Sequence, residues 1–147
     1  MSLRTWQKKS ATATPVTVLY VAFAGKDDPS FEIARSVSTL CATSPTARVL
    51  VLTDVARLAQ RVTRRCTAVC PQLATAPPGT RECDGGPRRL RSVVVRRQAV
   101  WRWLAPSGVT RLSHHSGLGG LAKLALDTLL PPCIERALYV DTDTLFV

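Results

Sequence analysis

Four short runs of apolar residues recur along the chain, and each is nearly continuous rather than alternating with polar positions. They are rich in β-branched and aromatic side chains and occupy residues 16–24, 47–54, 91–97 and 136–143. Continuous runs of this length are typical of strands that are buried on both faces, as in parallel sheets. The pattern therefore predicts four buried strands.

Between these runs, apolar residues recur at spacings of three and four. The spacing predicts three helices, over residues 30–42, 55–69 and 117–130. Ser30 is the expected N-cap of the first helix, whose expected buried face runs from Phe31 to Leu40, and Pro131 and Pro132 end the third helix. Strands that alternate with helices predict an α/β fold with a mostly parallel sheet.

A chain of 147 residues has the length of about one domain. We expect residues 1–15 to be frayed, 16–147 to form the domain, and the Pro- and Gly-rich stretch 71–90 to be a surface loop or insertion. Residues 1–24 also fit a signal peptide, since a basic start precedes an apolar run and Ala22-Phe23-Ala24 has the form of a cleavage site. We favour the strand interpretation because Val and aromatic residues dominate the run. No apolar stretch is long enough for a transmembrane helix.

The composition is strongly basic, with a net charge of +10 and arginine in most of the cationic positions. Such a surface favours polyanions, which include nucleic acids, anionic lipids and sugar nucleotides. A solvated basic face is the simpler interpretation. Aromatic residues make up 5% of the chain, which is too few for convincing base-stacking platforms.

Five cysteines are present, so at least one is unpaired within the chain. Cys66 and Cys70 have the spacing of one helix face. A zinc site needs two further ligands nearby, and neither a CxxC pair nor clustered histidines supply them. We therefore expect structural thiols.

The first strand leads into the turn "AFAGKDDPS" at residues 22–30. A nucleotide can lie across such a turn at the carboxyl end of the first strand of an α/β sheet. However, the turn has neither the GxGxxG fingerprint of dinucleotide-binding proteins nor the pattern of a P-loop.

The last apolar run leads into Asp141-Thr142-Asp143. In an extended strand the two aspartates point to the same face. Two neighbouring carboxylates repel each other, and a divalent cation removes the conflict; oxygen ligands suit Mg²⁺ or Mn²⁺, with phosphate oxygens and water completing the shell. The pair therefore predicts half of a diphosphate clamp. The alternative is a polar strand end that feeds a surface turn.

Lys123 precedes this strand and could neutralise charge on a departing diphosphate, or simply pair with Asp127 one helical turn away. His114 and His115 fit metal ligands, a base or polar loop residues, and the loop interpretation is favoured. The glycines at 117, 119 and 120 permit close approach of a ligand or a neighbouring backbone.

Residues 114–147 resemble the retaining glycosyltransferases of the glycogenin-like family 8, and most of all the first catalytic domain of LARGE-type xylosyl- and glucuronyltransferases. The similarity is carried by the DTD triplet together with His114, Ser116, Gly117, Gly120, Leu121, Lys123, Leu124, Pro131, Ile134, Glu135 and Arg136. The strands at 16–24 and 47–54 fit the same domain more loosely, and the stretch 71–90 departs from it.

The resemblance implies a Rossmann-like GT-A fold and a UDP-sugar donor. It implies transfer of a hexosyl or pentosyl group, with xylose suggested, to a glycan or glycoprotein acceptor with retention of configuration. It also implies a location in the Golgi lumen, although no membrane anchor is visible in this chain, and it leads us to expect no specific nucleic-acid partner.

The resemblance also implies roles for single residues. Asp141 and Asp143 would hold Mn²⁺ (or Mg²⁺), Thr142 would lie with them at the donor, and Lys123 would lie near the donor phosphates. The uridine site would be lined by Ala22, Ala24 and Gly25, and Asp54 would face the nucleotide.

Similar enzymes continue past the DxD strand with the acceptor site and a further histidine ligand. We therefore expect the amino-terminal half of a catalytic domain, truncated after the DxD strand, which binds donor weakly and does not turn over alone. A basic nucleic-acid-binding protein and a non-catalytic glycosyltransferase remnant remain as alternatives.

Overall fold

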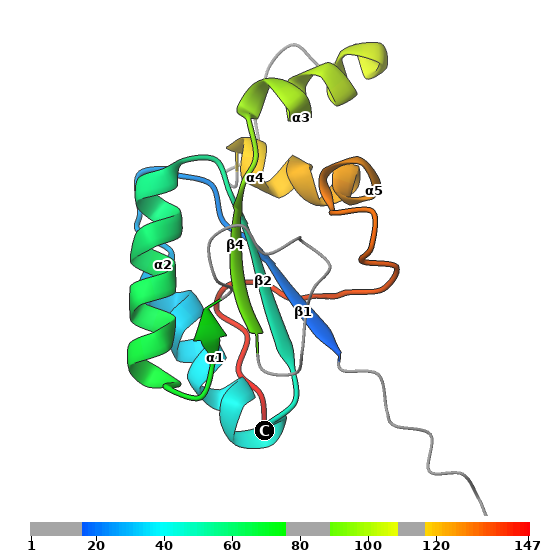
Figure 1. Ribbon diagram of the computed structural model, residues 1–147. Helices are drawn as coiled ribbons and strands as arrows, with labels where there is room; N and C mark the ends of the chain where they lie inside the picture. Colours follow the sequence, from blue (N-terminus) through cyan, green and yellow to red (C-terminus); the bar gives the residue numbers. More distant parts are fainter. Residues whose placement is uncertain (1–15, 76–88, 109–116) are drawn as a thin grey trace, which may run out of the picture.

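The computed structural model describes residues 16–75, 89–108 and 117–147. Within these ranges the chain forms one parallel sheet of five strands in the order β3-β4-β2-β1-β5 (Figure 1). The strands are β1 (Thr17–Val21), β2 (Arg48–Thr53), β3 (Ala74–Thr75), β4 (Arg89–Val94) and β5 (Leu138–Tyr139). The predicted α/β fold with a parallel sheet is confirmed.

Helices cover both faces of the sheet. One face carries α1 (Ser30–Thr43) and α2 (Ala56–Val69). The other carries α3 (Arg97–Leu104), α4 (Gly117–Ala122) and α5 (Leu126–Leu129), together with the 3-10 turns η1 (Ala105–Ser107) and η2 (Lys123–Ala125). In the part of the chain that the structure describes, no helix is long and apolar enough to cross a membrane.

The central strand β1 contributes to two hydrophobic cores. Val18 and Tyr20 pack with the buried side chains of α1 and α2, whereas Leu19 packs with those of α3 and α4. Neighbouring side chains of a strand point to opposite faces, and both faces here are covered. This explains why the apolar run at 16–24 does not alternate with polar residues, and it confirms the strand interpretation of that run.

Asp28 stabilises the amino end of helix α1. The Asp28 carboxylate accepts a hydrogen bond from the Ser30 amide (3.1 Å) and pairs with Arg61 (3.2 Å). The adjacent Ser30 and the nearby arginine charge lower the pKa of Asp28. The predicted N-cap was wrong: Pro29 occupies the cap, and Ser30 is buried in the first turn. Phe31 was also misassigned, since it is 62% exposed and lies beneath the Arg65 guanidinium.

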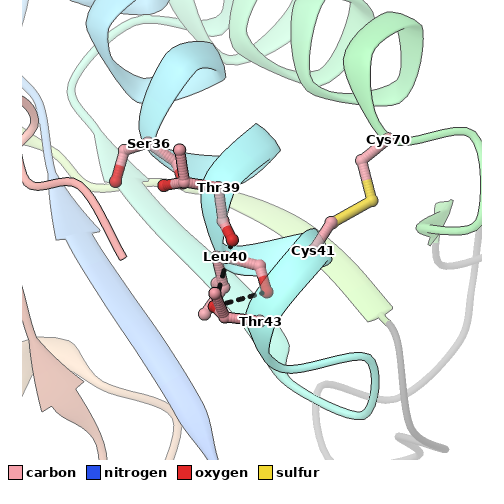
Figure 2. The surroundings of a disulfide bond; sticks show 6 residues. All are labelled: Ser36, Thr39, Leu40, Cys41, Thr43 and Cys70. Carbon is pink, nitrogen blue, oxygen red and sulfur yellow. Dashed lines mark hydrogen bonds between the residues drawn. A yellow bond between two sulfur atoms is a disulfide. The ribbon is translucent and has the colours of Figure 1, made fainter. Parts of the chain in front are cut away.

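A disulfide bond between Cys41 and Cys70 joins the carboxyl ends of α1 and α2 (Figure 2). Cys70 is the C-cap of α2, and its amide donates to the Cys66 carbonyl. Cys66 itself is a buried free thiol, and burial raises its pKa to about 12. The expectation that Cys66 and Cys70 are both plain thiols was therefore correct for Cys66 and wrong for Cys70.

The predicted strands and helices differ from the observed ones in the second half of the chain. The predicted helix over 117–130 is divided into α4, η2 and α5, and the expected strand over 136–143 shrinks to two residues. Helix α3 was not predicted, and the stretch 71–90 contains β3 and the start of β4. Residues 1–15, His114, His115 and the remaining positions of that stretch, 76–88, lie outside the described residues.

Candidate functional site

The order of the strands reverses at β1. The chain moves outward from β1 to β2 and β4, then returns to the other side of β1 to form β5. In parallel α/β sheets, ligands bind at such a switch point, outside the carboxyl ends of the strands. Because β1 and β5 are paired and parallel, the segments that follow them leave the sheet side by side. These segments, residues 22–29 and 140–144, form the candidate site.

The segment after β1 is held by a buried carboxylate from the end of β2. Asp54 accepts a hydrogen bond from the Ala24 amide (2.6 Å), and it forms an ion pair with the Nε of Arg97. Arg97, the first residue of α3, closes the ring by donating to the Ala24 carbonyl (2.6 Å). The Asp54 side chain is fully buried and that of Arg97 is 53% exposed. Both Asp54 oxygens are thus engaged within the chain, so the expectation that Asp54 faces a nucleotide was wrong.

The three small residues expected at the uridine site differ in exposure. Ala22 is 4% exposed and belongs to the α1/α2 core, so its side chain is not available to a ligand. Ala24 is half-buried and Gly25 is exposed, with open space where a Cβ would stand. Gly119 of α4 approaches Phe23, since a Cβ built there would lie 3.2 Å from the Phe23 Cβ. Of the three glycines expected to permit a close approach, Gly119 therefore makes one, to Phe23, whereas Gly117 has open space where a Cβ would stand.

The segment after β5 begins with a tyrosine–aspartate pair. The Tyr139 hydroxyl donates to Asp141 Oδ1 (2.8 Å), and the Lys123 ammonium lies 5.6 Å from the centre of the Tyr139 ring. Burial and the neighbouring carboxylate raise the pKa of Tyr139 to about 12. The phenol therefore stays a donor to Asp141 well above neutral pH. Lys123 thus lies near this ring, and the alternative ion pair with Asp127 is not formed, since the Asp127 carboxylate accepts from the Thr128 amide.

Asp141 begins a β-turn rather than continuing the strand. Its carbonyl accepts from the Thr144 amide (3.1 Å), and the Thr142 hydroxyl donates to Glu32 of α1 (2.9 Å). The chain then passes back along α1, where the Phe146 amide donates to Thr39 (Figure 1). The predicted extended geometry, with Asp141 and Asp143 as same-face neighbours in a strand, was therefore wrong: the same-face partner of Asp141 is Tyr139.

The donor set of this turn suits a hard divalent cation only in part. Asp141 and Asp143 are both exposed, and Asp143 makes no hydrogen bond or ion pair with any described residue. Within the described ranges, no cluster of three or more His, Cys, Asp or Glu side chains is placed to hold a metal ion. Two carboxylates leave most of the six positions around Mg²⁺ or a similar ion to other oxygen ligands. The turn by itself offers two exposed carboxylates and no further protein ligand among the described residues.

A hollow of about 490 Å³ lies at the opposite edge of the sheet. It is bordered by the amino ends of β1, β2 and β5 and carries the charged side chains of Arg48, Glu135 and Arg136. Because ligands of parallel sheets bind at the carboxyl ends of the strands, this hollow is separate from the candidate site.

Comparison of the chain with protein-family models, with curated proteins and with solved structures found no match.

Two residues of the candidate site, at the carboxyl ends of the strands, were not identified from the sequence. Tyr139 could have been found, because it stands two residues before Asp141 on a strand and must share its face. Arg97 could not, since no local pattern connects it with Asp54, 43 positions earlier. The candidate site thus combines an anchored segment after β1 with an acidic turn after β5.

Proposed function

We propose that this chain forms the nucleotide-sugar-binding part of a retaining glycosyltransferase with a GT-A arrangement. One observation carries the proposal: the Asp141-Thr142-Asp143 turn and the anchored Ala24-Gly25 segment follow two paired strands at the edge where the sheet order reverses. This is the position at which open α/β sheets bind nucleotides. The resemblance of residues 114–147 to family 8 glycosyltransferases implies the same assignment.

In this proposal, the described residues would contact distinct parts of a UDP-sugar. Asp141 and Asp143 would share a Mn²⁺ or Mg²⁺ with the diphosphate, and this ion would neutralise charge on the departing UDP. The Tyr139 hydroxyl orients Asp141 through Oδ1. Lys123, which lies over the Tyr139 ring, would add a positive charge near the phosphates. Ala24 and Gly25 would leave room for the uridine.

The transferred group would be a hexose or a pentose such as xylose, and the acceptor a glycan or glycoprotein. The Cys41–Cys70 disulfide supports a lumenal location such as the Golgi, because disulfides form and persist in oxidising compartments.

Calorimetric titration with UDP, with and without Mn²⁺, tests the proposal. We expect binding that requires the cation and is lost in Asp141→Asn and in Asp143→Asn, whereas Asp127→Asn, an exposed aspartate of α5, leaves it unchanged. Equal heats with and without Mn²⁺ would contradict the proposal.

The same titration separates the two alternatives. A nucleic-acid-binding protein would bind DNA or RNA with a strong salt dependence that the Asp141 and Asp143 variants do not change. A non-catalytic remnant would bind neither UDP nor nucleic acid.

A further inference from the structure

Helix α2 presents a row of arginines to solvent. Its buried face consists of Leu58, Ala59, Val62 and Cys66. Arg57, Arg61 and Arg64, spaced four and three residues apart, follow the opposite face and are here called the α2 arginine stripe. Side chains at these spacings lie above one another on a helix, over about 10 Å of its length. Figure 1 shows α2 along one flank of the molecule.

The stripe is not explained by ion pairing within the chain. Arg61 pairs with Asp28, but Arg57 and Arg64 are exposed and their side chains make no hydrogen bond or ion pair with any described residue. Arg57 also lies in the first turn of α2, which contains no acidic residue. A cation there opposes the helix dipole, so its position costs stability rather than adding to it. The positive charge at this end therefore has no structural role that the fold itself explains.

Charge is segregated along the sequence. Between Val55 and Gly108, the described residues include nine arginines and no aspartate or glutamate. The acidic residues of the described part instead lie in the segments 27–54 and 127–143. Within the described ranges, α2 and β4 therefore carry arginines without acidic residues of their own, and such a concentration of positive charge attracts polyanions.

Two observations favour an anionic polysaccharide over a nucleic acid. The Arg65 guanidinium lies 3.3 Å above the ring of Phe31, the exposed aromatic residue beside the stripe, and so occupies the ring face on which a base would otherwise stack next to these arginines. The disulfide at the carboxyl end of α2 indicates an oxidising compartment, where acidic glycans are the available polyanions.

We propose that the α2 arginine stripe binds a linear anionic polysaccharide through its sulfate or carboxylate groups. Arg57 and Arg64 make the principal contacts, and guanidinium groups suit these planar or tetrahedral anions through paired hydrogen bonds. This surface does not depend on the proposed nucleotide-sugar site, and loss of UDP binding would leave it intact.

Heparin affinity tests the proposal with two charge-matched variants of the full chain. Arg57→Gln/Arg64→Gln removes two charges from the stripe, and Arg96→Gln/Arg102→Gln removes two exposed charges at and before α3. We expect the stripe variant to elute from heparin at clearly lower salt than the control variant. We also expect the slope of log affinity against log salt to fall by about two in the stripe variant.

A third variant separates loss of contact from loss of folding. Arg57→Lys/Arg64→Lys keeps the charges, and we expect it to retain more heparin affinity than Arg57→Gln/Arg64→Gln. We expect the circular dichroism spectra of the two stripe variants and the control variant to match that of the unmodified chain. Equal shifts for the stripe and control variants would overturn the proposal in favour of diffuse attraction. Binding to a DNA or RNA duplex that exceeds binding to heparin and depends on the same two arginines would also overturn it.

Discussion

The carboxylate of Asp54 and the backbone amide of Ala24 are joined by a hydrogen bond of 2.6 Å that connects the end of β2 to the segment after β1. Arg97 completes this connection by contacting both residues. The segment that leaves β1 at the candidate site is thereby fixed by the neighbouring strand and by α3. A nucleotide would meet a backbone that is already ordered, which lowers the conformational cost of binding.

Removal of this carboxylate should destabilise the fold. We expect Asp54→Ala to lower the free energy of unfolding by about 2–3 kcal/mol, because it leaves the Ala24 amide without its acceptor and removes the partner of Arg97. Asp54→Asn should cost less, since its amide oxygen can still accept from Ala24. Urea unfolding followed by circular dichroism measures both values.

A double-mutant cycle with Arg97→Ala provides the control. The effects of Asp54→Ala and Arg97→Ala should be less than additive, since the two side chains share one interaction. Strict additivity would show that the ring of contacts does not form in solution.

The two tyrosines of the chain should both resist ionisation. Burial raises the pKa of Tyr20 to about 12, and burial with the Asp141 carboxylate raises that of Tyr139 to about 12, against an ordinary value of 10.0. Each folded-state pKa lies above the unfolded value. The resulting stabilisation is therefore complete below pH 10 and is lost as the pH rises through about 12.

Ultraviolet titration of the phenolate measures these pKa values directly. Tyr20→Phe and Tyr139→Phe assign the two transitions, and Asp141→Asn should lower the pKa of Tyr139 while leaving Tyr20 unchanged. A transition near the ordinary value in the folded protein would contradict the buried position of Tyr20 or the contact between Tyr139 and Asp141.

The disulfide should contribute strongly to stability. It joins cysteines 29 positions apart, and closing a loop of this length in the unfolded chain corresponds to about 3.5 kcal/mol in the chain-entropy model. We expect Cys41→Ser/Cys70→Ser to lose most of this value on urea unfolding. Cys66→Ser, which removes the buried free thiol, serves as the comparison and should leave the disulfide intact in mass spectra of the unreduced protein.

The first half of the fold follows closely from the sequence, and the second half does not. The runs at 16–24 and 47–54 and the helices between and after them were located correctly, because buried strands and amphipathic helices have strong apolar patterns. The predicted strand over 136–143 failed because its apolar part ends at Val140, and the aspartates and threonines that follow favour a turn.

The sequence predicted where in the fold the candidate site lies, but it did not predict how the side chains of the site contact one another. The sequence places Asp141 and Asp143 at the end of a strand, and strand pairing then brings them beside the segment after β1. The contacts of Asp54, Arg97 and Lys123 depend on tertiary packing between segments far apart in the chain. Local sequence patterns do not indicate contacts between distant segments, so the contacts of these three residues could not be predicted from the sequence.

The most direct test of the account is the location of Mn²⁺ by paramagnetic broadening in the NMR spectrum of the full chain. In the presence of UDP, we predict that substoichiometric Mn²⁺ broadens the amide signals of Asp141 to Thr144 first, together with those of Ala24 and Gly25, and that Asp143→Asn abolishes the effect. Broadening that is unchanged by UDP, or that is centred on Glu135 at the opposite edge of the sheet, would contradict the proposed site.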